Sequence, residues 1–259
     1  MFDKLTKEQL SYMIGLFHGD GSLYETTRNR GKLAYEISIR DRDIIDKLVV
    51  LLSPLTKCIV TTRTRDTDFK GNYESIILTI HDKAFRDALK EYMPAGKKSK
   101  DITFYRDLSV QDYLRGLSDA DGSLGLADTR CFWSLCTSSE AVKDITCEII
   151  QQLTGLEKRI NRNTRDSVYN IVIYNEDAQI FVDYLYNNST IYLDRKHDKI
   201  NSIQSWKRTT TKRTGRRKSW TEAEDKLIQD TGYSLGDKMR LTSRTAQSIK
   251  TRLWRLNKK

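Results

Sequence analysis

Two stretches of the chain decide its fold: Tyr12-Met-Ile-Gly-Leu-Phe-His-Gly-Asp20-Gly-Ser-Leu23 and, 101 positions later, Tyr113-Leu-Arg-Gly-Leu-Ser-Asp-Ala-Asp121-Gly-Ser-Leu124. The aligned copies are identical at 7 of their 12 positions. A match of this quality inside one chain indicates an internal duplication. We therefore expect two structurally equivalent halves.

Each copy reads as an apolar helix that ends in Asp-Gly-Ser. Gly15 and Gly19 in the first copy stand four positions apart on one helical face, as do Gly116 and Ala120 in the second. Small residues at this spacing let two helix backbones approach closely, as in pairs of membrane helices. If the copies pack through these faces, two carboxylates arrive side by side at the helix C-terminal ends.

Those carboxylates belong to Asp20 and Asp121, and a helix C-terminus is an unfavourable place for them. The macrodipole is negative there, and two like charges in contact raise one pKa. A divalent cation between them resolves both conflicts, because carboxylate oxygens suit Mg²⁺. The sequence thus predicts a metal site. The alternative for one copy alone is a buried helix with a glycine cap, which two matched copies disfavour.

The two stretches resemble the LAGLIDADG motif of homing endonucleases, in the single-chain form that carries two copies. The nine motif positions fall on Met13 to Gly21 and on Leu114 to Gly122. The resemblance extends over roughly residues 1 to 206 once the flanking pattern is added.

The resemblance implies that Asp20 and Asp121 bind the metal, with Gly19 and Ala120 as adjoining metal positions. The implied metal is Mg²⁺, and Mn²⁺ or Ca²⁺ would substitute for binding. The first copy departs from the family at His18, where the motif has an earlier acid. The second copy keeps that acid as Asp119. Because this acid is not the family's metal ligand, the departure puts local capping in doubt rather than catalysis.

A lysine beside each metal site is also implied by the resemblance. Lys98 follows Asp20 by 78 positions, and Lys196 follows Asp121 by 75. Each would stabilise charge at the phosphate or polarise the attacking water. An ordinary surface lysine is the alternative at both positions. Close rivals for the lysine role are Lys97, Lys100, Arg195 and Lys199. Candidates for a further polar residue are Ser38 or Arg40 in the first half and Ser134 or Thr137 in the second.

Composition and charge bound the remaining possibilities. Of the 259 residues 38% are hydrophobic and 31% charged, and no apolar run approaches a membrane span. The first residues lack a signal-peptide core, so we expect an intracellular protein, in a bacterial or phage-infected cytoplasm or an organelle matrix. We also expect a monomer. The four cysteines have no metal-site spacing and are expected to be buried free thiols.

The net charge of +10 is concentrated at one end of the chain. Residues 207–259 hold 16 Lys and Arg against 5 Asp and Glu, whereas the rest holds 29 against 30. Much of any sequence-independent grip on nucleic acid should therefore come from this tail.

Hydrophobic spacing predicts the order of elements in each half. Residues 1–104 and 105–206 each read as αββαββα, an α+β unit with a four-stranded antiparallel sheet, and the two sheets would form a DNA-binding saddle. The expected elements are a helix opened by a capping box at Thr6 to Gln9, a hairpin over Ser22 to Arg40, a helix over Asp43 to Leu52, strands over Lys57 to Thr64 and Tyr73 to Ile80, and a helix over Lys83 to Tyr92; then a helix capped by Ser109, a hairpin over Ser123 to Cys136, a helix over Glu140 to Leu153, strands over Lys158 to Asn163 and Val168 to Tyr174, and a helix over Ala178 to Tyr186.

Basic and amide side chains gather on the expected hairpins. Arginine and asparagine read base edges, and β-ribbons fit the major groove of DNA. The alternative is a solvated sheet face with no partner. The residues predicted to bind DNA are Arg28, Arg30, Lys32, Arg40, Arg63, Arg65, Lys70, Arg130, Arg159, Asn161, Arg162 and Arg165.

Residues 207–218 form a basic linker that contains Arg216 and Arg217, and residues 219–259 resemble a Myb/SANT-like helix-turn-helix domain. The resemblance rests on an amphipathic helix with a capping box from Ser219 to Glu222, a short helix from Leu235 to Met239 and a basic helix from Ser243 to Leu256. A basic helical tail docked on the body is the alternative. The expected core is Trp220, Leu227 and Trp254, and the side chains expected to face DNA are Arg244, Gln247, Lys250 and Arg255.

Together these features predict a Mg²⁺-dependent, site-specific endonuclease acting on double-stranded DNA. The resemblance implies cleavage that leaves 3′ overhangs, and the unequal hairpins predict a long asymmetric target. The alternative is a binder that does not cleave, such as an intron RNA maturase or a DNA-binding repressor.

Overall fold

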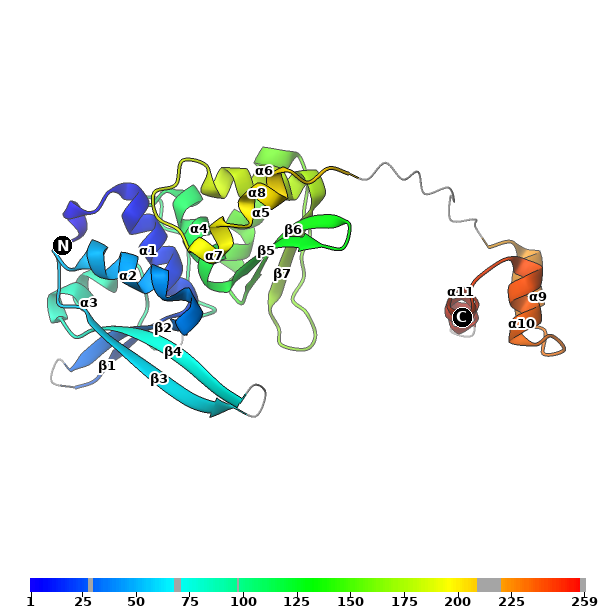
Figure 1. Ribbon diagram of the computed structural model, residues 1–259, viewed down its shortest axis with the longest axis horizontal. Coiled ribbons are helices and arrows are strands. Elements are labelled where there is room, and N and C mark those ends of the chain that lie inside the picture. Colours follow the sequence, from blue (N-terminus) through cyan, green and yellow to red (C-terminus); the bar gives the residue numbers. More distant parts are fainter. Residues whose placement is uncertain (28–29, 68–70, 97, 209–219, 257–259) are drawn as a thin grey trace. The chain divides into compact units, whose positions relative to one another are not determined.

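The structure is a computed structural model that describes residues 1–27, 30–67, 71–96, 98–208 and 220–256 (Figure 1). The chain divides into two compact units, residues 1–208 and 209–259, each considered by itself. None of the described helices is long and apolar enough to cross a membrane. Predictions for Arg28, Lys70, Lys97, Arg216, Arg217 and Ser219 lie outside the described residues.

Two packed helices, α1 (Lys7–Gly19) and α4 (Val110–Asp121), join the halves of the first unit. The expected capping box opens α1, where the Thr6 side chain accepts from Gln9 N and the Gln9 side chain accepts from Thr6 N. Ser109 caps α4. The helices cross at Gly15 and Gly116, where backbones touch without an intervening side chain. The predicted close packing of the two copies is confirmed.

The first half follows the predicted αββαββα order. Its strands form one antiparallel sheet in the order β1-β2-β4-β3, with helices on one side (Figure 1). Its last helix is three residues shorter than predicted. The elements are η1 (Phe2–Lys4), β1 (Gly21–Glu25), β2 (Gly31–Ser38), η2 (Ile39–Asp41), α2 (Arg42–Leu52), β3 (Ile59–Thr67), β4 (Gly71–Ile80) and α3 (Lys83–Leu89).

The second half has one strand fewer than predicted, and its sheet has the order β5-β6-β7. Residues Lys158 to Asn163 are described by the structure and do not form a strand, so the prediction of a strand there is wrong. The Lys158 side chain donates to Val172 O, a β7 backbone acceptor, and Arg162 Nη1 donates to Ser167 O at 2.7 Å. Side chains thus bind carbonyls in this segment. The elements are β5 (Gly122–Ala127), β6 (Arg130–Thr137), α5 (Glu140–Thr154), β7 (Tyr169–Tyr174), α6 (Asn175–Tyr186), α7 (Asp194–His197) and α8 (Ile200–Gln204).

Strand register gives the first sheet a covered face and an open face. Leu33, Tyr35 and Ile37 of β2 alternate into the core, where they pair with buried residues of β4. Lys32 and Glu36 point to the other face, which β3 extends with exposed residues. Side chains alternate across a strand, so this open face carries the polar positions of three neighbouring strands.

The second unit contains α9 (Glu222–Gln229), α10 (Leu235–Thr242) and α11 (Ala246–Leu256), packed around buried Ile228 and Ile249. Its capping box joins Thr221 and Glu224, two residues later than predicted. Trp254 is 59% exposed, so its expected place in the core is wrong.

The cysteines are free, as predicted, but their expected burial holds for only one of them. Cys131 is buried, Cys58 and Cys147 are half-buried, and Cys136 is exposed on β6.

Candidate active site at the ends of the paired helices

The ends of α1 and α4 bring the two motif acids into one place. Asp20 caps α1 and Asp121 is the last residue of α4, and both reach solvent. A Cβ added to Gly19 would lie 2.3 Å from Ala120 Cβ and 3.2 Å from Asp121 Oδ2, so the two helix ends are in contact. The small residues predicted to allow this approach are therefore required by the geometry.

The electrostatics of the two acids fit a shared site. Loss of solvent, followed by repulsion from Asp121, raises the pKa of Asp20 to about 6. Loss of solvent also raises the pKa of Asp121. Two acids with raised pKa values at an accessible surface are typical of a functional site rather than a structural one.

Two buried lysines cap the same helix ends. Lys98 Nζ donates to the carbonyls of His18 and Gly19 at 2.6 and 2.9 Å. Lys196 Nζ donates to the carbonyls of Ser118, Asp119 and Gly122. Both satisfy carbonyls that a helix end leaves free and oppose the negative end of the macrodipole. Neither is an ordinary surface lysine, since their exposed fractions are 7% and 4%.

Burial also changes the acidity of these lysines. Desolvation lowers the pKa of Lys98 and of Lys196 to about 8, against the opposing pull of nearby carboxylates. Ammonium groups with such pKa values give up a proton more readily than surface lysines.

Of the rival basic residues, Arg195 is held by Asp41 in a two-point ion pair at 2.6 and 2.9 Å. Lys199 donates to Leu124 O at 3.4 Å, and Lys100 is exposed. Lys98 and Lys196 therefore stand apart from these rivals in the described residues.

Tyrosines that directly precede the motif in each copy form hydrogen bonds between the two helices. Tyr12 Oη donates to Asp119 Oδ2 at 2.6 Å, and Tyr113 Oη contacts His18 Nδ1 at 2.8 Å. His18 Nε2 lies 2.8 Å from Tyr92 O, which can only accept. His18 is thus the Nε2–H tautomer, and its Nδ1 accepts a hydrogen bond from the Tyr113 hydroxyl.

His18 therefore replaces the motif's earlier acid as a hydrogen-bond acceptor. Burial lowers the pKa of His18 to about 4, which keeps the ring neutral. Asp119 accepts two further hydrogen bonds, from Tyr186 Oη at 2.6 Å and Leu193 N at 2.8 Å. The departure from the motif preserves the crossing contact.

A polar cavity of about 210 Å³ adjoins Asp20. Ser38 and Arg40, the predicted further polar residues of the first half, line it. Asp41 and Glu36 also line it, and the sequence analysis missed them; Arg195, expected only as a rival of Lys196, lines it too. The ion pair of Asp41 with Arg195 joins the two halves, and no spacing in the sequence indicates it.

The corresponding polar candidates of the second half have local partners. Ser134 Oγ lies 3.4 Å from Ser123 O, and the buried Thr137 accepts from Ser139 N at 3.1 Å. The polar candidates of the first half therefore line a cavity, whereas those of the second half bond to nearby residues.

Residues predicted to bind DNA in the first half reach solvent at the open side of the sheet. Arg30, Lys32 and Arg63 are exposed. Arg40 lies 3.7 Å from Asp41, and Arg65 pairs with Glu36 on the open face.

In the second half the predicted DNA-binding residues lie on loops and one strand. Arg130 opens β6 and stands over the Tyr174 ring, and Asn161 is exposed. Arg159 and Arg165 are each 88% exposed at the side chain and pair with neighbouring acids. Arg162 stands over the Tyr169 ring at 4.4 Å.

Helix α11 presents Gln247, Lys250 and Arg255 to solvent, as predicted. Arg244 does not face outward. Its guanidinium lies 4.0 Å from the Trp220 ring centre and pairs with Glu224 at 2.9 Å, so it joins the segment before α11 to the start of α9.

The side chains at the ends of α1 and α4 supply only part of the ligand set of a divalent cation. The described residues hold no group of three or more His, Cys, Asp or Glu side chains able to bind a metal. Two carboxylates remain, and Mg²⁺ commonly uses one or two carboxylates with waters and substrate phosphates. Gly19 O already accepts from Lys98. The residues present therefore fit a metal that is completed by phosphate oxygens.

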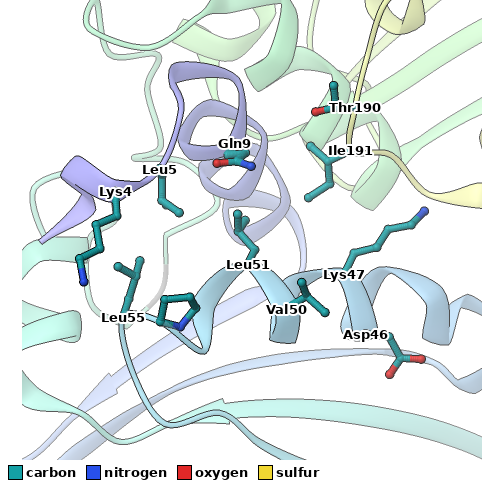
Figure 2. Close-up of a pocket in the computed structure, with 11 residues that line it drawn as sticks. Lys4, Leu5, Gln9, Asp46, Lys47, Val50, Leu51, Leu55, Thr190 and Ile191 are labelled. Carbon is teal, nitrogen blue, oxygen red and sulfur yellow. The ribbon is translucent and has the colours of Figure 1, made fainter.

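A larger cavity, of about 590 Å³, has a different character (Figure 2). Leu5, Val50, Leu51, Leu55 and Ile191 are among its lining residues, and none of the predicted site residues lines it. The acids and lysines of the candidate site are thus separate from this cavity.

Solved structures share the fold of this chain. The homing endonuclease I-WcaI bound to its DNA recognition sequence is 18% identical, with a TM-score of 0.54, over 76% of this chain and 87% of its own. The homing endonuclease I-DmoI in complex with DNA and Mn is 17% identical, with a TM-score of 0.48, over 71% and 99%.

The N-terminal LAGLIDADG domain of DUF199/WhiA is also similar, at 14% identity and a TM-score of 0.47, over 73% of this chain and 86% of its own. No family model and no curated protein matches the chain. The predicted LAGLIDADG-like α+β fold with two antiparallel sheets is confirmed at low identity.

Proposed function

We propose that the chain is a site-specific endonuclease that cuts both strands of double-stranded DNA with the help of a divalent metal. The observation that carries this proposal is the contact of two helix ends that places Asp20 and Asp121 together, each with a raised pKa. A purely structural helix crossing would not need two acids at its solvent-facing end.

Asp20 and Asp121 would hold Mg²⁺, or Mn²⁺, at the scissile phosphates, with Gly19 and Ala120 adjoining. When bound, the metal supplies an activated water and stabilises the leaving oxygen. The acids supply the negative charge that keeps the cation in place. The pKa of about 6 means that Asp20 is fully ionised only at neutral or higher pH, and the pKa of Asp121 is raised as well.

Lys98 and Lys196 would stabilise phosphate charge from beneath each site through their positive charge, because the three donors of Lys196 Nζ are already bound to carbonyls. Their hydrogen bonds to the helix-end carbonyls fix each Nζ close to the acids. Buried, preorganised cations of this kind stabilise developing negative charge more strongly than mobile surface lysines.

DNA would lie across the open face of the first sheet and the exposed arginines of the second half. Lys32, Arg63 and Arg130 would contact phosphates or base edges. Exposed Gln247, Lys250 and Arg255 of α11 would extend the bound site as part of a helix-turn-helix unit. Different side chains in the two halves predict an asymmetric target.

Binding without cleavage is the second candidate function, and one observation favours it. No third His, Cys, Asp or Glu joins Asp20 and Asp121 within the described residues. A repressor or an RNA maturase would need the basic surfaces but not the metal.

A selection from a randomised DNA duplex library distinguishes these functions. The protein is incubated with the library and Mg²⁺, and both cleaved and bound duplexes are sequenced. The endonuclease proposal predicts cleaved ends with 3′ overhangs at one long asymmetric sequence. Recovery of a bound but intact sequence would instead support the binder.

A further inference from the structure

An acidic side chain occupies the open face of the first sheet, among the residues proposed to bind DNA. Glu36 of β2 lies opposite Ile77 of β4, which lies opposite Thr61 of β3. Two positions along, Arg63 shares this face. A carboxylate beside DNA repels phosphates, so the presence of Glu36 on this face requires an explanation.

Glu36 is bound to Arg65 of β3 and Ser75 of β4. Arg65 Nη2 and Ser75 Oγ both donate to Glu36 Oε1, the second at 2.7 Å. Ser75 is fully buried and thus fixes the carboxylate from below. The carboxyl and the guanidinium keep 31% and 39% of their side-chain surfaces exposed. The two groups are held together but remain accessible from the open face.

Stability alone is a weak reason for this pair. Ion pairs with this much exposure contribute little to stability. Arg65 Nε is buried and has no hydrogen-bond partner among the described residues, which is unfavourable. The fixed orientation of the two side chains is the more informative feature.

The pair offers hydrogen-bonding groups that complement one base pair. In the major groove, guanine presents two acceptors and the paired cytosine presents one donor. Arginine donates to guanine, and glutamate accepts from the cytosine amino group. An A·T pair presents its donor on the purine, between two acceptors, and a methyl group at the thymine edge, so it does not match.

We propose that Glu36 and Arg65 form one reading unit that recognises a single G·C base pair, in the target half bound by the first sheet. This inference rests on the proposed binding of double-stranded DNA but not on cleavage. Glu36 restrains Arg65 before DNA arrives, which lowers the ordering cost on binding. Arg65 donates to the guanine, and Glu36 accepts from the cytosine.

The pair also lies next to the candidate site. Glu36 and Asp20 line the same cavity, together with Tyr73, the β4 residue opposite Arg65. The G·C pair should therefore fall in the part of the half-site nearest the ends of α1 and α4.

The test is a binding selection on randomised duplexes in EDTA, so that cleavage plays no part. Base preference at every position is compared for the full chain and for the variants Arg65→Ala, Glu36→Ala and Arg63→Ala. The full chain should prefer G·C at one position that both Arg65→Ala and Glu36→Ala lose, by roughly 5- to 150-fold for Arg65→Ala. Arg63→Ala, a comparison variant from the same strand and face, should lower affinity or change the preference at another position while the G·C preference at this position stays.

Two conservative variants keep the test valid if an alanine variant fails to fold. Arg65→Lys keeps the charge but lacks the planar guanidinium that can be held by Glu36 and present a fixed pair of donors to guanine, so it should weaken the preference at that position. Glu36→Gln keeps an acceptor for Arg65 and Ser75, and should reduce the preference less than Glu36→Ala.

The outcomes separate this inference from the proposed function. Preferences that disappear at different positions, or a uniform loss of affinity, would overturn the reading unit while leaving DNA binding intact. A shared G·C position in a protein that does not cleave in Mg²⁺ would support the inference and refute the nuclease. No sequence-specific binding by the full chain would overturn both.

Discussion

Gly15 and Gly116 approach so closely that a Cβ added to either would lie 3.1 Å from the Cα of the other. The same added atoms would lie 2.2 Å from Tyr113 O and Tyr12 O. Backbone cannot yield as a side chain can, so only glycine fits at this crossing. The crossing in turn sets the contact between the helix ends that carry Asp20 and Asp121.

Substituting either crossing glycine should therefore be severely destabilising. We expect Gly15→Ala and Gly116→Ala each to cost at least about 3 kcal/mol, because the clash is with backbone on both sides. Urea unfolding of the purified variants measures this. Gly236→Ala in α10 is the control, since its Cβ would meet only Ser234 Oγ at 3.7 Å. Wild-type stability in Gly15→Ala would contradict the tight crossing.

The motif helices and their pairing were predictable because their signals are local. Thr6 and Ser109 are caps readable from spacing, and Gly15 and Gly116 mark the contact face. Alternation predicted β2 and β4 because their covered faces are regularly apolar.

The remaining features of the fold and the site depend on contacts between residues far apart in the sequence, and these contacts limited what could be predicted. In the sequence Lys158 fits a strand, but in the structure its side chain donates to Val172 O. Arg244 fits a DNA contact in the sequence, but in the structure it contacts Trp220 and Glu224. Both depend on segments that only the folded chain brings together. Lys98 was placed by resemblance, but its binding of helix-end carbonyls was not.

His18 should make the fold sensitive to acid. Its pKa falls from 6.5 to about 4 on folding, so between these values the unfolded chain binds more protons. Stability from this group is present above pH 6.5 and is lost as pH falls toward 4. The loss should reach about 2–3 kcal/mol between pH 7 and pH 4.5.

The variant His18→Gln isolates this contribution. Glutamine can donate to Tyr92 O and accept from Tyr113 without titrating. Urea unfolding at pH 7 and pH 4.5 should therefore show a smaller pH-dependent loss in His18→Gln than in the wild type. Equal losses would mean that His18 is protonated in the folded protein.

Asp20 should have the opposite linkage. Its folded pKa of about 6 lies above the ordinary value of 3.8, so the folded chain binds more protons between these values. Stability falls as pH rises from 4 to 6 and is lowest above 6. Asp20→Asn should thus melt at a higher temperature than the wild type at pH 7.5 in EDTA.

Mg²⁺ should reverse this order, because it binds the folded wild type and stabilises it by mass action. Thermal unfolding in EDTA and in Mg²⁺ measures both effects. A lower melting temperature for Asp20→Asn in EDTA would show that the carboxylate has a structural role.

The basic tail should contribute nonspecific affinity. Residues 209–259 contain 14 Lys and Arg against 5 Asp and Glu. A chain ending at Arg208 should bind the selected target more weakly and with a shallower salt dependence, by about 0.9 in slope for each DNA phosphate that the tail would have neutralised. Cleavage position should not change. An unchanged slope would exclude the tail from the DNA interface.

A surface comparison localises this effect to α11. Lys250→Ala and Arg255→Ala remove exposed charges of the expected recognition helix, and Lys226→Ala removes an exposed charge of α9. The first two should weaken binding, and the third should not. Equal effects from all three would indicate a diffuse electrostatic contribution.

Double-strand cleavage by Asp20→Asn and Asp121→Asn, with affinity measured in the same samples, tests the central claim most directly. Asp46→Asn, an exposed acid on α2, is the matched control. We predict that each motif variant loses cleavage by at least about a thousandfold, because the metal loses a charged ligand worth several kcal/mol, while target affinity stays within a few-fold. Wild-type cleavage by either motif variant would contradict the shared metal site.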